Sequence, residues 1–151
     1  PDVTNASRRI KKSEFDLCQK NGVKNITEVL VGFDGIAIAN ALNGPDFNSL
    51  SLRSLYLGLA AKVPASVKGG NDADMINNPF KNWSEIDSKL PNIAIKVLGP
   101  PPTSGTRDAL QELAIEGGCK TFPQMKAMKK TNKKKYKSLC RNVRAFVLPD
   151  W

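Results

Sequence analysis

The sequence contains no histidine among its 151 residues. Histidine is the usual general base near neutral pH and the commonest transition-metal ligand, so its absence argues against triad hydrolases and zinc enzymes. A Gly-x-Ser-x-Gly nucleophile elbow and a Gly-x-x-x-x-Gly-Lys phosphate loop are also missing from the sequence. We therefore expect a binding protein rather than an enzyme, with no cofactor and no catalytic or metal-ligating residues.

No apolar run is long enough to cross a bilayer, and residues 1–10 lack the apolar centre of a secretory signal. A secretory signal peptide that was removed before residue 1 is compatible with the absence of a signal from residues 1–10. A chain of this length with 40% hydrophobic residues can bury one core but not two well-built ones. Composition thus favours a single α/β unit.

The three cysteines, Cys18, Cys119 and Cys140, show no Cys-x-x-Cys spacing, which removes support for a zinc ribbon or a thioredoxin-type site. Cys119 and Cys140 flank a lysine-rich stretch. Their spacing fits a disulfide in an oxidising compartment and fits free buried thiols in a cytosolic protein about equally well. Cys18 is left over in either case.

Basic residues exceed acidic ones by nine, which should attract phosphate, nucleic acid or an acidic membrane face. The stretch from Lys126 to Arg144 could follow a phosphodiester backbone, but only Phe122 and Tyr136 lie near it as stacking aromatics. A solvated helical face is the favoured interpretation. This stretch defines our alternative function, a basic nucleic-acid-binding or adaptor domain.

Local patterns predict several elements in the first half. The Ser13-x-x-Asp16 start and the Asn21-Gly22 end indicate a short helix. Alternating apolar residues predict strands over 28–33 and 35–42. Ser51 can cap a helix with apolar residues at helical spacing, and residues 62–81 have the composition of a surface loop.

The second half is expected to contain a short strand over residues 93–98, followed by a helix that opens at Ser104 and ends before Gly117-Gly118. That helix should bury Leu110 and Leu113. Two further helices are expected around Met125 and from about residue 133 through Val143, separated by a break near Thr131-Asn132.

Ser104-Gly105-Thr106-Arg107 combines two hydroxyls, a glycine that admits close backbone approach, unpaired helix-start amides and a guanidinium. All of these favour a compact tetrahedral anion, because they converge at the positive end of a helix dipole. The alternative is a simple N-cap with a solvated arginine, which is the commoner fate of an arbitrary Ser-Gly-Thr.

Read in order, these segments resemble the phosphate-binding proteins of bacterial ABC phosphate importers. Thr4-Asn5-Ala6-Ser7-Arg8-Arg9 is similar to a Ser-Ser-Arg loop of that family, and residues 33–37 and 52–58 resemble its hinge-proximal strand and a following helix. The last two motifs of the resemblance, in the order in which the family has them, are Asn82-Trp83 and Ser104-Gly105-Thr106-Arg107. The similarity extends to about Val143, while the ending from residue 145 fits poorly.

The resemblance implies an α/β chain that is part of a two-lobed type II periplasmic-binding-protein-like fold, incomplete at both ends. Residues 1–42 would belong to the first lobe with its hinge-proximal strands, and residues 43–151 to the second. Such a receptor works in the periplasm, its signal peptide lying outside this chain, and delivers phosphate to permease subunits. Phosphate binding would then also need the missing segments of the same receptor, and no nucleic acid is expected.

The resemblance also implies roles for individual residues. Ser104, Gly105, Thr106 and Arg107 would hold phosphate from one lobe, and Ser7 would donate from the other. Arg8 would add charge or orient a carboxylate. Asp34 could accept a proton of bound phosphate and so disfavour sulfate; its alternative is a turn aspartate before Gly35. The resemblance further supports a Cys119–Cys140 disulfide and a partner for Cys18 outside this chain.

Overall fold

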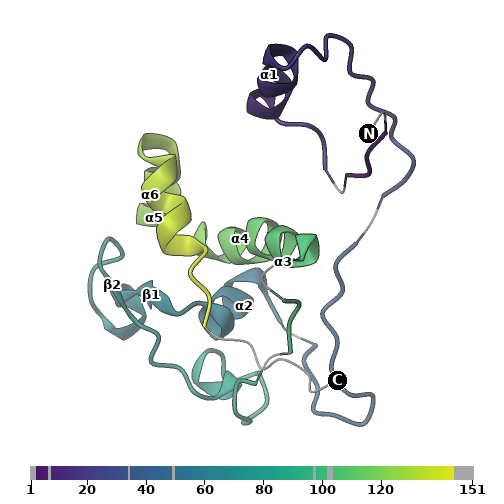
Figure 1. Ribbon diagram of the computed structural model, residues 1–151. Helices are drawn as coiled ribbons and strands as arrows, with labels where there is room; N and C mark the ends of the chain where they lie inside the picture. The colour runs from purple at the N-terminus through teal and green to yellow at the C-terminus, as the bar shows by residue number, and fades with distance from the viewer. Residues whose placement is uncertain are drawn as a thin grey trace. The chain divides into compact units, whose positions relative to one another are not determined.

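The computed structural model describes residues 3–6, 8–33, 35–48, 50–96, 98–101 and 104–144. The chain divides into two compact units, Pro1–Ala37 and Ile38–Trp151. Figure 1 labels their helices and strands. The assignment of residues 1–42 and 43–151 to two lobes stays a prediction.

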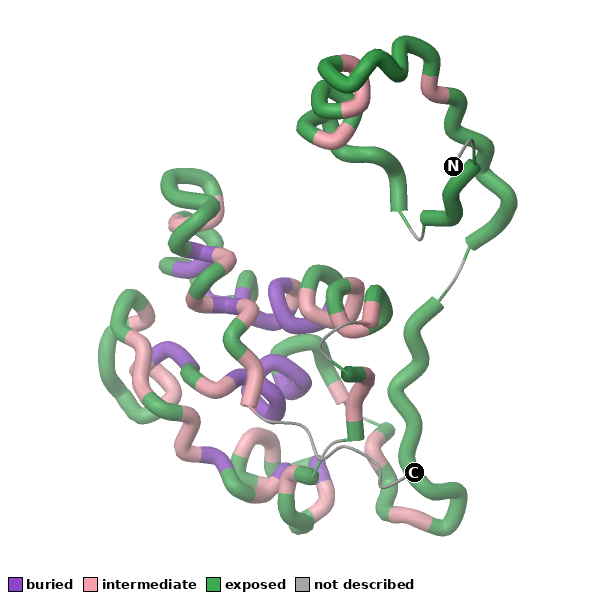
Figure 2. Tube along the Cα trace, viewed as in Figure 1, coloured by how far each residue is buried: buried purple, intermediate pink, exposed green. Residues whose placement is uncertain are grey.

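Unit 1 contains the helix α1, Lys12–Lys20, close to the predicted position. The Glu14 side chain accepts a hydrogen bond from the Lys11 amide at 2.9 Å, so one of the unpaired donors at the helix start is satisfied. The helix ends at Asn21, and Gly22 follows with φ of 86°. Among the described residues of this unit none is buried (Figure 2).

The two strands predicted over residues 28–33 and 35–42 are absent from the described parts of those ranges, so this prediction was wrong. Val31 and Phe33 are 95% and 96% exposed. Alternation of apolar side chains favours a strand only when a neighbouring strand supplies the hydrogen-bond ladder and an apolar layer covers one face. Neither is present around these described residues.

Unit 2 opens with α2, Leu52–Leu59, as the sequence predicted. The Ser51 hydroxyl accepts a hydrogen bond from the Ser54 amide at 3.0 Å, which caps the first turn. Leu55, Tyr56 and Leu59 are buried, because their spacing places them on one face of the helix.

The predicted surface loop over residues 62–81 instead contains a small antiparallel pair, β1 (Lys62–Pro64) and β2 (Met75–Asn77), so the loop prediction was wrong there. Val63 pairs with Ile76. Between the strands, the 3-10 turn η1 (Ala65–Lys68) ends at Gly69, whose φ of 82° favours glycine.

After a second 3-10 turn, η2 (Trp83–Glu85), the described residues of the predicted strand over residues 93–98 form isolated bridges only, at Ala94, which pairs with Asn82, and at Leu98. The prediction of a continuous strand was therefore wrong.

The predicted helix after Ser104 is present as three joined segments: α3 (Gly105–Leu110), the π-helical η3 (Gln111–Ile115) and α4 (Glu116–Cys119). A π turn inserts an extra residue and rotates the face that follows. Leu113 is consequently 66% exposed, contrary to prediction, while Ile115 is fully buried. The helix also continues through Gly117-Gly118 rather than ending before them.

The last two helices are α5, Pro123–Thr131, and α6, Lys133–Cys140. They are separated at Asn132, as predicted. Asn132 caps α6 by accepting a hydrogen bond from the Lys135 amide at 3.0 Å. Val143 lies beyond α6 and forms a bridge with Ala60, so the prediction that α6 runs through Val143 was wrong.

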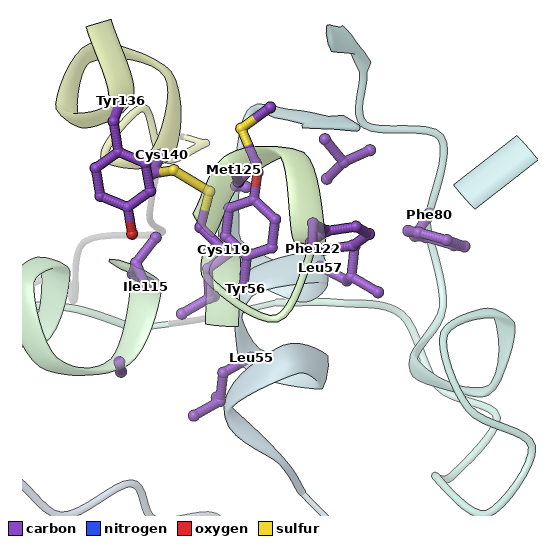
Figure 3. Close-up of a cluster of buried hydrophobic side chains, with 14 residues drawn as sticks. Leu55, Tyr56, Leu57, Phe80, Ile115, Cys119, Phe122, Met125, Tyr136 and Cys140 are labelled. Carbon is purple, nitrogen blue, oxygen red and sulfur yellow. A yellow bond between two sulfur atoms is a disulfide. The ribbon is translucent and has the colours of Figure 1, made fainter. Parts of the chain in front are cut away.

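The core of unit 2 lies between α2, α4, α5 and α6 (Figure 3). Tyr56 and Tyr136 are fully buried within it, and the Cys119–Cys140 disulfide joins α4 to α6 across a sequence separation of 21. Closing a loop of that length stabilises a fold by about 3 kcal/mol in the chain-entropy treatment. The observed bond confirms the predicted Cys119–Cys140 disulfide.

Within the described ranges, no helix combines the length and apolar character that a membrane span requires.

Candidate anion-binding site at the start of α3

Ser104 immediately precedes α3 and has an extended backbone conformation. The Ser104 hydroxyl accepts a hydrogen bond from the Thr106 amide at 3.2 Å. The Ser104 carbonyl accepts the Arg107 amide at 3.1 Å. Ser104 is therefore an N-cap, as the simpler interpretation of the sequence expected. This cap fixes the direction in which the first turn of α3 presents its remaining donors.

Gly105 and Thr106 are exposed, and neither the Gly105 amide nor the Thr106 hydroxyl has a hydrogen-bond partner among the residues that the structure describes. The helical path continues from α3 through η3 and α4 to Cys119, so the partial positive charge of this end is that of a helix several turns long. An anion placed there would meet an amide, a hydroxyl and a positive dipole end.

Arg107 is half-buried, and its guanidinium donates a hydrogen bond to the Pro100 carbonyl at 3.2 Å. Pro101 and Pro102 have no amide proton, so neither residue can donate to a carbonyl on this approach. The Pro101 carbonyl accepts the Ser104 amide at 3.0 Å, and the Pro100 carbonyl accepts the Arg107 side chain. Sequence reasoning missed the Arg107–Pro100 contact, although the proline run was its available signal. The contact holds the guanidinium beside the start of α3 rather than leaving it in solvent.

Asp108 brings a negative charge into the same first turn. Its carboxylate stabilises the helix dipole, and it also opposes an anion bound at the helix start. The electrostatic balance of the site therefore depends on donors supplied in addition to those of α3.

Of the remaining predicted ligand residues, Arg8 lies in unit 1, where its guanidinium pairs with Glu14 through bonds of 2.9 and 2.7 Å. Arg8 has a further interaction within the protein. Ser7 and Asp34 lie outside the described residues. Within the described ranges, no cluster of three or more His, Cys, Asp or Glu residues could hold a metal ion.

The alternative function, a basic nucleic-acid-binding domain, is not favoured. Phe122 and Tyr136, the two aromatics near the lysine-rich stretch, are 1% and 0% exposed. Their rings pack in the core of unit 2 and cannot stack on bases.

Residues 1–145 match the PBP superfamily domain, and the chain belongs to this superfamily. Its helices and small sheet fit part of the α/β type II periplasmic-binding-protein fold, the architecture of a class of solute-binding proteins rather than of enzymes.

Two curated relatives share the name Protein SphX. The protein from Synechococcus elongatus is 34% identical over 114 residues, which cover 76% of this chain and 29% of the relative. The protein from Synechocystis sp. is 26% identical over 114 residues, covering 76% and 30%. The chain thus spans less than one third of the length of these relatives. No solved structure matches the chain significantly.

Proposed function

We propose that this chain is the phosphate-contacting part of a periplasmic solute-binding protein, which binds inorganic phosphate without chemical reaction and delivers it to the permease subunits of an ABC importer. The observation that carries the proposal is the start of α3, where an exposed amide and hydroxyl lie in the same turn as the Arg107 guanidinium. Membership of the PBP superfamily supports a binding role.

Phosphate suits this set of donors because its oxygens accept charge-assisted hydrogen bonds from several directions. Gly105 would contribute its amide, Thr106 its hydroxyl and Arg107 one face of its guanidinium. Ser104 would either keep its cap on the Thr106 amide or turn its hydroxyl toward the ligand. Because Asp108 opposes the anion, we expect weak binding unless further donors are added.

The further donors in this proposal come from Ser7 and Arg8, and from segments of the receptor outside this chain. Asp34 would accept the proton of monohydrogen phosphate, a contact that fully ionised sulfate cannot make. The Cys119–Cys140 disulfide supports a periplasmic location, since such bonds persist in oxidising compartments.

Isothermal titration calorimetry with phosphate and sulfate tests the site. Loss of a hydrogen bond to a charged partner removes about 1.5–3 kcal/mol, so Arg107→Gln should weaken phosphate binding on the order of 10- to 100-fold. Thr106→Val should weaken it by a smaller factor. Lys62→Gln, which removes the same charge at an exposed position of β1, is the matched control and should leave the phosphate affinity within about twofold.

If Arg107→Gln and Thr106→Val bind phosphate as the unchanged chain does, the site is wrong. If the unchanged chain shows no heat with phosphate up to millimolar concentration, the proposed function of this chain is wrong. The role of Asp34 is tested separately: Asp34→Asn should narrow the preference for phosphate over sulfate, and an unchanged preference would contradict it.

A further inference from the structure

The positive charge of the chain is concentrated in one segment. Ten of the 23 basic residues lie between Gly117 and Pro149, and none of the 14 acidic residues does, so the rest of the chain carries 13 basic against 14 acidic side chains. The whole formal charge of +9 therefore comes from this segment. Nothing in the proposed phosphate site requires such a concentration.

The structure places most of this charge at one end of the α5–α6 pair. Thr131 and Asn132 form the turn between the helices, and exposed lysines lie on both sides of it. Figure 2 shows the turn exposed while buried residues gather toward the other end of the pair. The exposed lysines of this end are Lys130, Lys133, Lys134 and Lys135, with Lys126 one turn earlier on α5.

These lysines have no structural task that explains them. None of the five forms an ion pair within the described part of the chain, whereas the half-buried Lys129 does, with Glu116 at 3.5 Å. Lys133, Lys134 and Lys135 occupy the first turn of α6, where positive charge opposes the helix dipole. Their position therefore costs helix stability, although the Asn132 cap offsets part of it.

We propose that this lysine-rich turn, defined as Lys126, Lys130, Lys133, Lys134 and Lys135, is an interaction surface for the anionic headgroups of a phospholipid bilayer. The residues of the turn favour a lipid surface over a protein or a nucleic acid. A protein partner is disfavoured because the described turn has no exposed aromatic or arginine side chain of the kind that dominates protein interfaces. A nucleic acid is disfavoured because the neighbouring aromatic side chains are buried and cannot stack on bases. Flexible lysine point charges suit a diffuse field of headgroups.

Packing and a disulfide fix the α5–α6 pair to the rest of unit 2, so the lysine-rich turn is presented at an exposed end. Tyr136 and Cys140 bury one face of α6, and the Cys119–Cys140 disulfide ties that helix to α4. Tyr136 also donates a hydrogen bond to the Glu116 carbonyl at 2.9 Å. Adsorption would thus need no refolding of unit 2, only close approach of the exposed end.

The test is co-sedimentation of the full chain with vesicles of equimolar phosphatidylglycerol and phosphatidylcholine, compared with pure phosphatidylcholine vesicles. We expect binding only to the anionic vesicles and its loss at about 1 M salt, where screening acts over roughly 3 Å. A lysine near an anionic surface contributes about fivefold, so the triple change Lys133→Gln, Lys134→Gln and Lys135→Gln should weaken partitioning on the order of 100-fold.

The matched control is the triple change Lys62→Gln, Lys81→Gln and Lys89→Gln, which removes equal charge from exposed positions elsewhere in unit 2 and should weaken partitioning less than tenfold. A triple lysine-to-arginine change in the turn should retain binding. Circular dichroism and thermal unfolding show whether each variant is folded. Equal loss in both glutamine triples, no binding to anionic vesicles at low salt, or tighter binding to a short DNA duplex through the same lysines would each overturn the proposal.

Discussion

At the residue scale, the Glu14 carboxylate in unit 1 is held by more charge-assisted contacts than any other described carboxylate of that unit. Arg8 donates to both of its oxygens, and the Lys11 amide donates to Oε2 at 2.9 Å. These bonds, with the arginine contact the largest, lower the pKa of Glu14 from 4.5 to about 2. The pair thereby joins the segment before α1 to the first turn of that helix.

This arrangement predicts a specific pH response. The folded-state pKa of Glu14 is lowered, so its contribution to stability is present above the ordinary value of 4.5 and is lost as the pH falls from there to about 2. Arg8→Gln should raise the pKa of Glu14 toward 4.5, with the Lys11 amide holding back part of the change. Titration of the side-chain carboxyl by NMR measures this directly.

Glu85 is the internal control, because backbone amides of Lys81 and Asn82 lower its pKa without an arginine. Its titration should not respond to Arg8→Gln. A Glu14 carboxyl that titrates near 4.5 in the unchanged chain would contradict the bidentate contact.

Glu116 shows why some residues escape sequence reasoning. It is 3% exposed, and its carboxylate pairs with Arg141, which lies 25 positions later, and with Lys129. A charge can be buried only when such partners are brought to it. Burial beside this carboxylate raises the pKa of Tyr136 to about 12. Nothing in the local pattern around Glu116 indicates either effect.

At the element scale, the packing of α4 on α2 depends on Gly118. A side chain at this position would overlap the Leu52 carbonyl oxygen and the Tyr56 Cβ, and would lie 2.9 Å from the Leu52 carbonyl carbon. These are backbone and near-backbone atoms in the core, which cannot move without separating the helices. The Gly117-Gly118 pair, expected from sequence to end the helix, is therefore a close-approach site inside it.

Gly118→Ala should accordingly destabilise the protein by about 3 kcal/mol or prevent folding, since overpacking a core typically costs 1–3 kcal/mol and here backbone must move. The neighbouring Gly117→Ala is the matched control. Its Cβ would meet only the end of the Leu52 side chain at 3.1 Å, and alanine favours a helix over glycine by up to about 1 kcal/mol. Urea unfolding of both variants measures the difference; equal effects would show that Gly118 does not set the helix contact.

The elements that were predicted correctly are those with local causes. The Ser51 cap, the Asn21-Gly22 end of α1 and the Asn132 break lie within a few residues of the helices that they delimit. The wrong elements depend on distant partners: a strand over 28–33 needs a ladder, and the pair β1–β2 forms where turn-rich composition predicted only loop. The π turn η3, which exposes Leu113, also left no periodic signal.

At the scale of the whole molecule, the same division applies to the candidate site. Sequence alone indicated the local geometry at Ser104–Arg107, because an N-cap and its free donors are properties of one turn. It could not indicate the Pro100 contact of Arg107, since that contact joins the helix to a segment seven residues away whose path the local pattern does not fix. The ligand roles of Ser7 and Asp34 stay predictions. The family fold followed from the order of motifs rather than from any single motif.

The distribution of the core leads to a last prediction. Every buried residue in the described part of the chain lies between Ser54 and Cys140, within unit 2. Because stability comes mainly from buried apolar surface and from the disulfide, the fragment of residues 38–151 should unfold cooperatively. Its midpoint should lie within about 3 °C of that of the full chain, which corresponds to a difference in unfolding free energy below roughly 0.7 kcal/mol for a domain of this size.

The opposite truncation is the control for this experiment. A fragment of residues 1–110 keeps α1 and α2 but loses Ile115, Phe122, Tyr136 and both disulfide cysteines, so it should show no cooperative transition in thermal unfolding followed by circular dichroism. If residues 38–151 unfold without a transition while the full chain has one, then unit 1 contributes to folding in a way that its exposed side chains do not indicate. If the midpoint is retained but phosphate binding is weakened, unit 1 acts on the ligand rather than on the fold, as the proposed roles of Ser7 and Arg8 require.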